Sequence, residues 1–399
     1  MRDVVIAGYL RTAQSRSRPR DPGRDWLHKV RADTLMGKYL VPELLKRAGV
    51  DPKEIDDLIV GSAMGVSEQW TYGGRNIVLL ANLPESVAAK FVDQQCGSAM
   101  AATHIGYMEI ATGNADIVVT GGIEHMTRVP MGGGGDAIKP NMDLFSAEEY
   151  KHWGMNIAMN MGFTAEKLST IAGIDRLEQE KWSVRSHQLA AKGQAEGFFK
   201  GEILPIEVEQ ADGTKMIVDT DQAVRGDTTL EALAQLKPAY SETGIITAGT
   251  SSPLNAAATS MLLMSKETAK KKGITPLATI RALGFAGVDP TIMGIGPVPA
   301  SRKALAQAGL AAKDIDYWEI NEAFSVVALN CIKELGIDPE RVNIYGGGVA
   351  IGHPLGATGV RLIGTLARIL NLKGGRYGCA NACVGGGQGV ATIIEREKY

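Results

Sequence analysis

Cys96 is the first residue of the chain whose setting suits a reactive thiol. It follows the apolar run at 88–92 and precedes the small residues at 97–102, which begin a predicted helix. A helix N-terminus stabilises a thiolate, and small neighbours leave room for a bulky substrate. A buried packing cysteine is the competing interpretation, because free cysteine is among the residues most often found in protein interiors. This motif alone leaves both interpretations open.

A second thiol stands in the glycine-rich segment Cys383-Val-Gly-Gly-Gly-Gln-Gly389. Because glycines leave backbone amides unobstructed, a turn of this kind can bring amides together on an oxyanion. Cys379 precedes it closely, but a Cys-x3-Cys pair without a second ligand pair is a poor zinc site. We therefore assign Cys331 and Cys379 to core packing and predict no metal site.

One histidine, His353, stands in a glycine-rich segment at 346–359, between a predicted strand and a predicted helix. Pro354 fixes the backbone directly after it, and the glycines leave space around the imidazole. A histidine held in this way can exchange a proton or a hydrogen bond with a substrate atom or a nearby thiol. The alternative, a histidine that satisfies loop carbonyls, explains the surrounding glycines poorly. None of the other histidines is expected in the site.

The motif Asn321-Glu322-Ala323-Phe324 ends a predicted strand that begins near Asp316. Open α/β sheets place their sites at the carboxyl ends of strands, so the Asn321 amide is a candidate to hold a water or an oxyanion there. An asparagine before a helical run is also a good helix cap, and both roles are compatible.

These residues need a layered scaffold of strands and helices to bring them together. Short apolar runs predict buried strands at 4–7, 57–60, 117–120, 317–320 and 341–345. Apolar residues at three- and four-residue intervals predict helices at 33–48, 98–112, 323–335 and 359–370. Glycine clusters follow the apolar runs, as in strand-to-helix turns. The pattern is typical of an α/β protein.

Two segments of the chain resemble each other. Residues 48–56 and 308–316 both lead the end of a helix into a strand, with similar sequences. A second parallel matches Cys96 with Asn321, because each is followed at the same separation by a Gly-Gly pair. The two parallels use different registers, so coincidence is the alternative to a duplication. The segment at 123–247 differs from the rest of the chain in its sequence pattern, and we expect it to be an insertion between two similar halves.

Composition excludes several classes of protein. With 22% charged and 45% hydrophobic residues in 399, the chain has enough apolar side chains to fold compactly. A net charge of −2 offers no overall field for nucleic acid or anionic membrane. No apolar run is long enough for a membrane span. Four cysteines in so long a chain predict free thiols in a reducing compartment, and we expect a cytoplasmic protein.

Taken together and in this order, the motifs resemble those of the thiolase family, and within it the degradative 3-oxoacyl-CoA thiolases. The motifs are Cys96-Gly-Ser-Ala-Met, Gly121-Gly-Ile-Glu-His-Met126, Met161-Gly-Phe-Thr-Ala-Glu166, Thr247-Ala-Gly249, Asn321-Glu-Ala-Phe324, Gly352-His-Pro354 and Cys383-Val-Gly-Gly-Gly. The resemblance implies duplicated βαβαβαββ halves in five layers, α-β-α-β-α. It also implies an N-terminal half at 1–122 completed by 248–273, a loop domain at 123–247 that contacts CoA, and a C-terminal half at 274–399.

The resemblance also implies a role for each motif residue. Cys96 would be the nucleophile that takes the acyl group, and His353 would withdraw its proton. Cys383 would be the acid/base for the acetyl-CoA enolate. One oxyanion hole would come from His353 and a water held by Asn321, and the other from the backbone amides of Cys96 and Gly385.

The implied reaction is cleavage of a 3-oxoacyl-CoA by CoA to acetyl-CoA and a shortened acyl-CoA, so CoA is a co-substrate and no cofactor is covalently bound. Arg225 would lie near the adenine or phosphate end of CoA and Ser252 along the pantetheine. Met161 and Phe324 belong to the motifs expected at the substrate. The alternatives are an acetyl-CoA acetyltransferase that makes or cleaves acetoacetyl-CoA and, more remotely, a non-catalytic acyl-CoA-binding scaffold.

Three departures from the family pattern stand out. Asn160 replaces a histidine that many short-chain acetoacetyl-CoA thiolases carry, which disfavours a dedicated enzyme of that kind. Residues 255–258 read Asn-Ala-Ala-Ala in place of an Asx-Asp-Gly-Ala run, which affects an expected helix start facing CoA. The N-terminal arm lacks the usual proline after Thr12 and contains Trp26.

From the family we also expect a homodimer or homotetramer, with a hydroxyacyl-CoA dehydrogenase as a hypothetical partner.

Overall fold

The computed structural model describes residues 1–134 and 137–397, so residues 135–136 of the expected loop domain and the last two residues of the expected C-terminal half lie outside the described residues. The strands are β1 (Val4–Arg11), β2 (Ser15–Arg16), β3 (Asp57–Gly61), β4 (Ala88–Val92), β5 (Ile117–His125), β6 (Ile206–Glu209), β7 (Lys215–Val218), β8 (Asn255–Ser265), β9 (Ala278–Gly287), β10 (Tyr317–Ile320), β11 (Tyr377–Val384) and β12 (Gln388–Glu395). The helices are α1 (Ala32–Thr34), α2 (Val41–Ala48), α3 (Arg75–Leu80), α4 (Ser98–Thr112), α5 (Asp143–Ser146), α6 (Met155–Ala158), α7 (Met161–Ala172), α8 (Arg176–Ala195), α9 (Leu230–Ala234), α10 (Lys266–Lys272), α11 (Pro297–Ala308), α12 (Ser325–Leu335) and α13 (Thr358–Lys373). Single turns of 3-10 helix at Gln95–Gly97 and Leu355–Ala357 precede α4 and α13.

The large sheet consists of two halves with the same strand order. In the first half, β1 pairs antiparallel with β8, β8 antiparallel with β5, and β5 parallel with β3, which pairs parallel with β4. In the second half, β9, β12, β11 and β10 repeat the first three of these pairings in the same order, and no described strand takes the place of β4. The halves are joined where β1 meets β9 through two residue pairs. The sheet therefore carries the duplication that the sequence predicted.

Two aspartates mark equivalent positions in the halves. Oδ2 of Asp56 accepts hydrogen bonds from the amides of Asp116 and Ile117, at 2.7 and 3.0 Å. Oδ2 of Asp316 accepts from the amides of Arg376 and Tyr377, again at 2.7 and 3.0 Å. Each aspartate thus ties the start of one strand, β3 or β10, to the start of the parallel strand beside it, β5 or β11. The parallel between 48–56 and 308–316 is confirmed in this detail.

The other proposed register, Cys96 with Asn321, is wrong. Cys96 follows β4, the third strand of its half, whereas Asn321 follows β10, the second strand of the other. Equal spacing to a glycine pair misled the comparison, because strand-to-helix turns in both halves use glycine. The predicted strand at 341–345 is also wrong: this stretch forms turns, and Val342 alone makes a parallel bridge, to Trp318.

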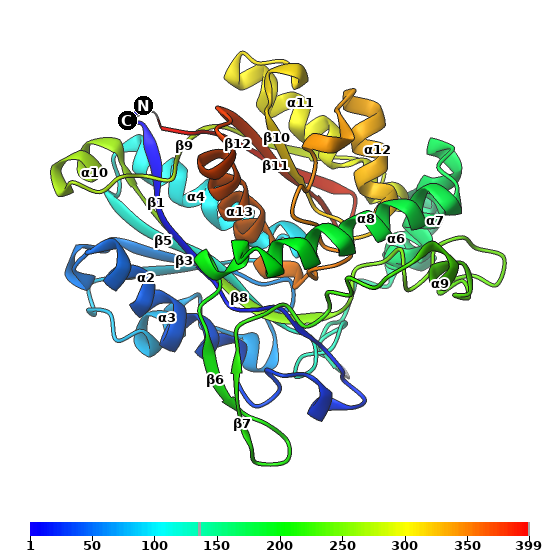
Figure 1. The fold of residues 1–399 in the computed structure, drawn as a ribbon, viewed down its shortest axis with the longest axis horizontal. Coiled ribbons are helices and arrows are strands. Elements are labelled where there is room, and N and C mark those ends of the chain that lie inside the picture. The colour runs from blue at the N-terminus through cyan, green and yellow to red at the C-terminus, as the bar shows by residue number, and fades with distance from the viewer. Residues whose placement is uncertain (135–136, 398–399) are drawn as a thin grey trace.

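The elements stack in five layers (Figure 1). Helices α2 and α3 cover the outer face of the first half-sheet, and α11 and α12 cover that of the second. Helices α4 and α13 contact each other between the half-sheets. The predicted α-β-α-β-α arrangement is confirmed. It directs the N-termini of α4 and α13, the two central helices, toward one region of the molecule.

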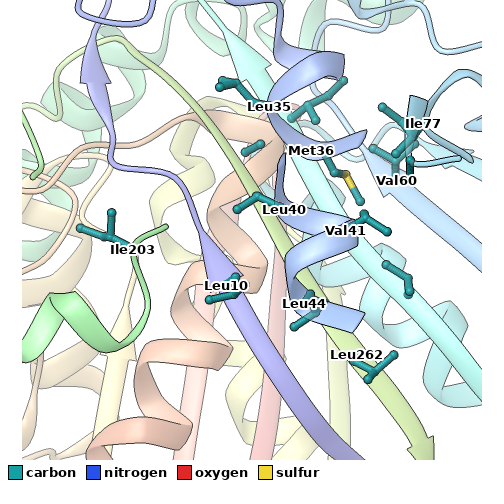
Figure 2. Packing of buried hydrophobic residues seen from close by; sticks show 14 of the residues in the cluster. Leu10, Leu35, Met36, Leu40, Val41, Leu44, Val60, Ile77, Ile203 and Leu262 are labelled. Atoms are coloured by element: carbon teal, nitrogen blue, oxygen red, sulfur yellow. The ribbon is translucent and has the colours of Figure 1, made fainter. Parts of the chain in front are cut away.

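Apolar side chains between the first half-sheet and its outer helices form the largest core, part of which Figure 2 shows. The predicted helix at 33–48 is helical throughout, but a π-helical stretch, Leu35–Leu40, interrupts it. Met36, Leu40 and Leu44 recur at four-residue intervals and face the sheet. Burial of each such side chain contributes about 1.5–3 kcal/mol.

Between β5 and β8 the chain leaves the sheet and runs through α5 to α9 and the β6–β7 hairpin. Arg11, at the end of β1, holds this segment through a fully buried set of ion pairs. Its Nε donates to Glu202 at 2.7 Å, and its Nη1 and Nη2 donate to Asp221 at 2.7 and 2.9 Å. The anchored segment covers the end of the sheet from which the site opens. Across the described ranges, no helix has the length and apolar character needed to cross a membrane.

Candidate active site

A cavity of about 250 Å³ lies where the two halves meet the segment between β5 and β8. Cys96 and His353 both line it, one from each half. The rest of the wall is mostly apolar and includes Met126, Met131, Met159, Met161, Met293, Phe324 and Leu355. A thiol and an imidazole therefore face a largely apolar space.

Cys96 lies in the 3-10 turn just before α4, so the sequence-based prediction of a helix start is confirmed. Burial, together with the charge of Glu124, raises the pKa of its thiol to about 12. Hydrogen bonds from the backbone amides of Gly385 and of Cys96 itself oppose this rise. The sulfur is thus a neutral thiol at pH 7, and two amides point at it.

The α4 and α13 helices reach this region because glycines replace side chains at their contacts. A Cβ on Gly97 would lie 2.9 Å from the Val384 side chain, beside Cys383. A Cβ on Gly359 would lie 2.3 Å from the backbone nitrogen of Met100. Substitution of either glycine would therefore push the two halves of the site apart.

His353 is held on three sides. Its backbone amide donates to Oδ1 of Asn255 at 2.9 Å, and its Nδ1 lies 2.6 Å from the hydroxyl of Thr358. Gly352, with φ of 125°, packs directly against the Asn255 side chain. Only glycine adopts this backbone conformation without strain. The glycine-rich setting of the histidine thus serves to orient its ring.

The other ring nitrogen of His353, Nε2, lies 3.3 Å from Nδ2 of Asn321. An amide nitrogen only donates, so Nε2 accepts this hydrogen bond. The ring proton is then on Nδ1, which donates a hydrogen bond to the Thr358 hydroxyl. Burial, and then the charge of Arg361, lower the pKa of His353 to about 3, so the ring is neutral at pH 7. Oδ1 of Asn321 is buried and has no hydrogen-bond partner among the described residues. It is therefore available to bind a water.

Cys383 stands near the end of β11 and is fully buried among apolar side chains that include Met293 and Phe324. Burial raises the pKa of its thiol well above the usual value, and the neighbouring thiols of Cys96 and Cys331 add to the rise. Gly385 follows in the turn between β11 and β12. The structure therefore places the second thiol near Cys96 in its neutral form.

A second cavity, of about 480 Å³, adjoins the first and shares Tyr240, Ser252, Pro253 and Leu254 with it. Arg225 and Ser252, the residues expected at CoA, line this second cavity. Met161 and Phe324 line the first. Six of the predicted site residues therefore line two adjoining cavities. Asn321, Cys383 and Gly385 line neither cavity, but Asn321 contacts His353, and Cys383 and Gly385 lie close to Cys96.

Some residues with a clear role in the site were not identified from the sequence. Residues 255–258 are the start of β8 and not a helix start, and Asn255 joins His353 to Ser15 by hydrogen bonds. Glu322 is a buried acceptor for Trp182, Ser186 and the loop amide of Val349. Asn255 is a lone polar residue between Leu254 and three alanines, which was the available signal, whereas Glu322 directly follows Asn321 and had no separate signal.

Within the ranges that the structure describes, no group of three or more His, Cys, Asp or Glu side chains is arranged to hold a metal ion.

The neutral state of Cys96 leads to a testable pH dependence. Iodoacetamide reacts with the thiolate, so the rate of Cys96 alkylation is expected to rise about tenfold per pH unit from about pH 7 to pH 10, without a plateau. Peptide mass spectrometry at timed intervals measures the rate. A plateau below about pH 8 would instead indicate a preformed thiolate–imidazolium pair and contradict this assignment.

Comparison with known proteins gives full-length matches. Residues 4–267 match the family model "Thiolase, N-terminal domain", and residues 274–396 match "Thiolase, C-terminal domain". The 3-ketoacyl-CoA thiolases of Marinobacter nauticus and Hahella chejuensis are 43% and 42% identical, over 99% of this chain and 98% of each relative. The crystal structure of the Bacillus anthracis acetyl-CoA acetyltransferase superposes with a TM-score of 0.87 at 36% identity, over 100% of this chain and 99% of that one.

Proposed function

Because the chain belongs to the thiolase family, we propose that it cleaves 3-oxoacyl-CoA with CoA, giving acetyl-CoA and a shortened acyl-CoA. The observation that carries the proposal is the meeting of Cys96 and His353 in one mostly apolar cavity. Acyl transfer needs a thiol nucleophile, a base for its proton and a dry pocket for the acyl group. Relatives over 40% identical bear the name 3-ketoacyl-CoA thiolase, which supports the same reaction.

In the first step the Cys96 sulfur attacks the C3 carbonyl, and its proton moves to Nε2 of His353. Nε2 is free to accept it because Nδ1 already carries a proton held by Thr358. With the thiol pKa at about 12 and the imidazole pKa at about 3, this transfer is unfavourable in the free enzyme. We therefore expect it to accompany carbon–sulfur bond formation, when the two amides near the sulfur can stabilise the developing oxyanion.

Cleavage of the C2–C3 bond leaves an acyl group on Cys96 and the enolate of acetyl-CoA. The enolate carbon needs a proton, which we assign to the neutral thiol of Cys383. The enolate oxygen needs donors, which we assign to His353 and to a water held by Asn321. In the second step a CoA thiol, deprotonated in turn, attacks the acyl-enzyme and releases the shortened acyl-CoA.

The apolar cavity beside Cys96 supports acyl groups longer than acetyl. Five of its lining residues are methionines, whose flexible side chains adapt to different shapes. Asn160, which stands in place of the histidine of many acetoacetyl-CoA thiolases, caps α7 by accepting the amide of Gly162 at 3.1 Å. The Asn160 side chain therefore caps the N-terminus of α7 at the wall of the cavity.

For a series of 3-oxoacyl-CoA substrates, we expect kcat/KM to rise with chain length until the cavity is filled. Each buried methylene contributes about 0.8 kcal/mol, or roughly fourfold. Thiolysis is followed by the loss of absorbance of the 3-oxoacyl thioester. Met161→Ala should shift the optimum toward longer chains, whereas Met108→Ala, at an exposed methionine of α4 away from the cavity, should leave it unchanged.

Activity confined to acetoacetyl-CoA would favour the acetyl-CoA acetyltransferase alternative, which the name of the matching Bacillus anthracis protein supports. Binding of acyl-CoA without any turnover would favour the non-catalytic scaffold. The same residues serve condensation and cleavage, so the direction of the reaction in the cell follows from substrate supply.

We further propose the division into an N-terminal half at 1–122 completed by 248–273, a loop domain at 123–247 and a C-terminal half at 274–399. We also propose that the protein is a cytoplasmic homodimer or homotetramer and that its partner is a hydroxyacyl-CoA dehydrogenase. Native mass spectrometry of the purified protein distinguishes the two oligomers, and co-purification tests the partner.

A further inference from the structure

Arg16 lies on the wall of the 480 Å³ cavity, together with Arg225. It belongs to β2, in the N-terminal arm, whereas Arg225 belongs to the segment between β5 and β8. Neither guanidinium forms a hydrogen bond or ion pair with any residue that the structure describes. Two arginines from distant parts of the chain thus face one cavity without acidic partners.

The arrangement is electrostatically unfavourable in the free protein. Arg16 is half-buried, and burial followed by the charges of Arg18, Arg225 and Arg24 lowers its pKa to about 10. None of the described residues that line the cavity is acidic. Repulsion of this kind is relieved when an anion binds between the charges.

His187 completes the basic surroundings without adding a charge. Its Nδ1 accepts the backbone amide of Arg225 at 3.2 Å, which requires a neutral ring at that nitrogen. Burial and the charges of Arg225 and Arg16 lower its pKa to about 4, while Asp227 opposes them. The two guanidiniums are therefore the cationic donors of this cavity.

The backbone of Arg16 is fixed relative to the reacting groups. Its amide donates to Oε1 of Gln222 at 2.8 Å, and it pairs in register with Asn255, the residue that also holds the His353 amide. Tyr240, Ser252, Pro253 and Leu254 line both cavities. A single extended ligand can therefore occupy both, with one end at Cys96 and the other between the arginines.

We propose that Arg16, together with Arg225, binds a phosphate group of CoA and so positions the thioester at Cys96. This inference rests on the proposed function, since it takes CoA as the molecule that spans the two cavities. Guanidinium groups suit phosphate because they donate two parallel hydrogen bonds to it. Arg16 is a positioning residue: it acts on the bound end of the substrate and not on the reacting atoms.

The test compares Arg16→Ala and Arg16→Lys with Arg20→Ala, which removes a charge from an exposed position of the same arm that does not line the cavity. Each variant is assayed with CoA, 3′-dephospho-CoA and pantetheine as the accepting thiol. We expect Arg16→Ala to raise the KM for CoA about tenfold or more with kcat within about twofold, Arg16→Lys to recover part of the loss, and Arg20→Ala to resemble the wild type. At saturating 3-oxoacyl-CoA, the KM for pantetheine should be the same in all variants.

The pattern across the thiols identifies the phosphate. A loss that disappears with 3′-dephospho-CoA assigns Arg16 to the 3′-phosphate, and one that persists there but disappears with pantetheine assigns it to the pyrophosphate. A loss that persists with pantetheine, or one that Arg20→Ala shares, overturns the inference. Calorimetric titration separates the two proposals. If the wild type cleaves no 3-oxoacyl-CoA, the proposed function fails. The phosphate site is still supported if Arg16→Ala binds CoA more weakly than the wild type does but binds pantetheine equally well.

Discussion

Cys96→Ser is expected to lower kcat/KM for thiolysis by about 10⁴-fold or more. A serine hydroxyl is far harder to deprotonate than a thiol, and the neutral His353, with its pKa lowered to about 3, is a weak base for that task. The variant should also fail to form an acyl-enzyme. Intact-protein mass spectrometry after incubation with 3-oxoacyl-CoA detects the added acyl mass directly.

Cys379→Ser is the matched control for that experiment. Cys379 is a buried thiol of β11 whose sulfur lies 3.9 Å from the Ser301 hydroxyl, so a serine there keeps a partner. We expect its activity to stay near that of the wild type. An acyl adduct that still forms on Cys96→Ser protein, at another residue, would contradict the assignment of the nucleophile.

Cys383→Ser is expected to separate the two halves of the reaction. Carbon–carbon cleavage needs a proton for the enolate, so its rate should fall by about 10²–10⁴-fold, the usual contribution of a positioned general acid. Transfer of an acyl group from one acyl-CoA to free CoA involves no enolate and needs only Cys96 and His353. Exchange of labelled CoA into acyl-CoA should therefore continue at a rate within about tenfold of the wild type, since the chemistry at Cys96 remains.

Two assays on the same protein sample measure this prediction: thiolysis by absorbance and CoA exchange by isotope. Loss of exchange in parallel with thiolysis would show that Cys383 supports the Cys96 region structurally and would contradict its role as the proton donor. His353→Ala provides the contrast, because removal of the base should depress both rates together.

The sequence provided candidate site residues that the fold brings close together, but it predicted some of the elements wrongly. Cys96, His353, Cys383 and Asn321 could be identified because each stands in a local setting, a glycine turn or a strand end, that favours reactive groups. The roles of Asn255 and Thr358 in orienting His353 could not. Asn255 contacts the histidine from 98 positions away in the chain, a contact that depends on the folded sheet.

The errors in the fold have a similar origin. The run at 341–345 contains Val342, Ile344 and Tyr345, as a short strand could, but there the chain turns after Val342 and makes a single bridge. Short apolar runs do not distinguish a strand from a buried turn, because burial alone selects the same side chains. The helix start that the family pattern implied at Asn255 is wrong, because pairing with β2 and β5 makes these residues the start of β8.

The place of β12 in the sheet governs how the chain can fold as it is synthesised. Gln388–Glu395 is inserted between β9 and β11, so the second half-sheet stays open on the ribosome until these residues emerge. β1, made first, likewise waits for β8 and β9. Such late, distant pairings slow folding and expose unpaired strand edges in the meantime. Nascent chains halted before residue 388 are therefore substrates for chaperones and proteases, although they already contain every residue assigned here to the chemistry.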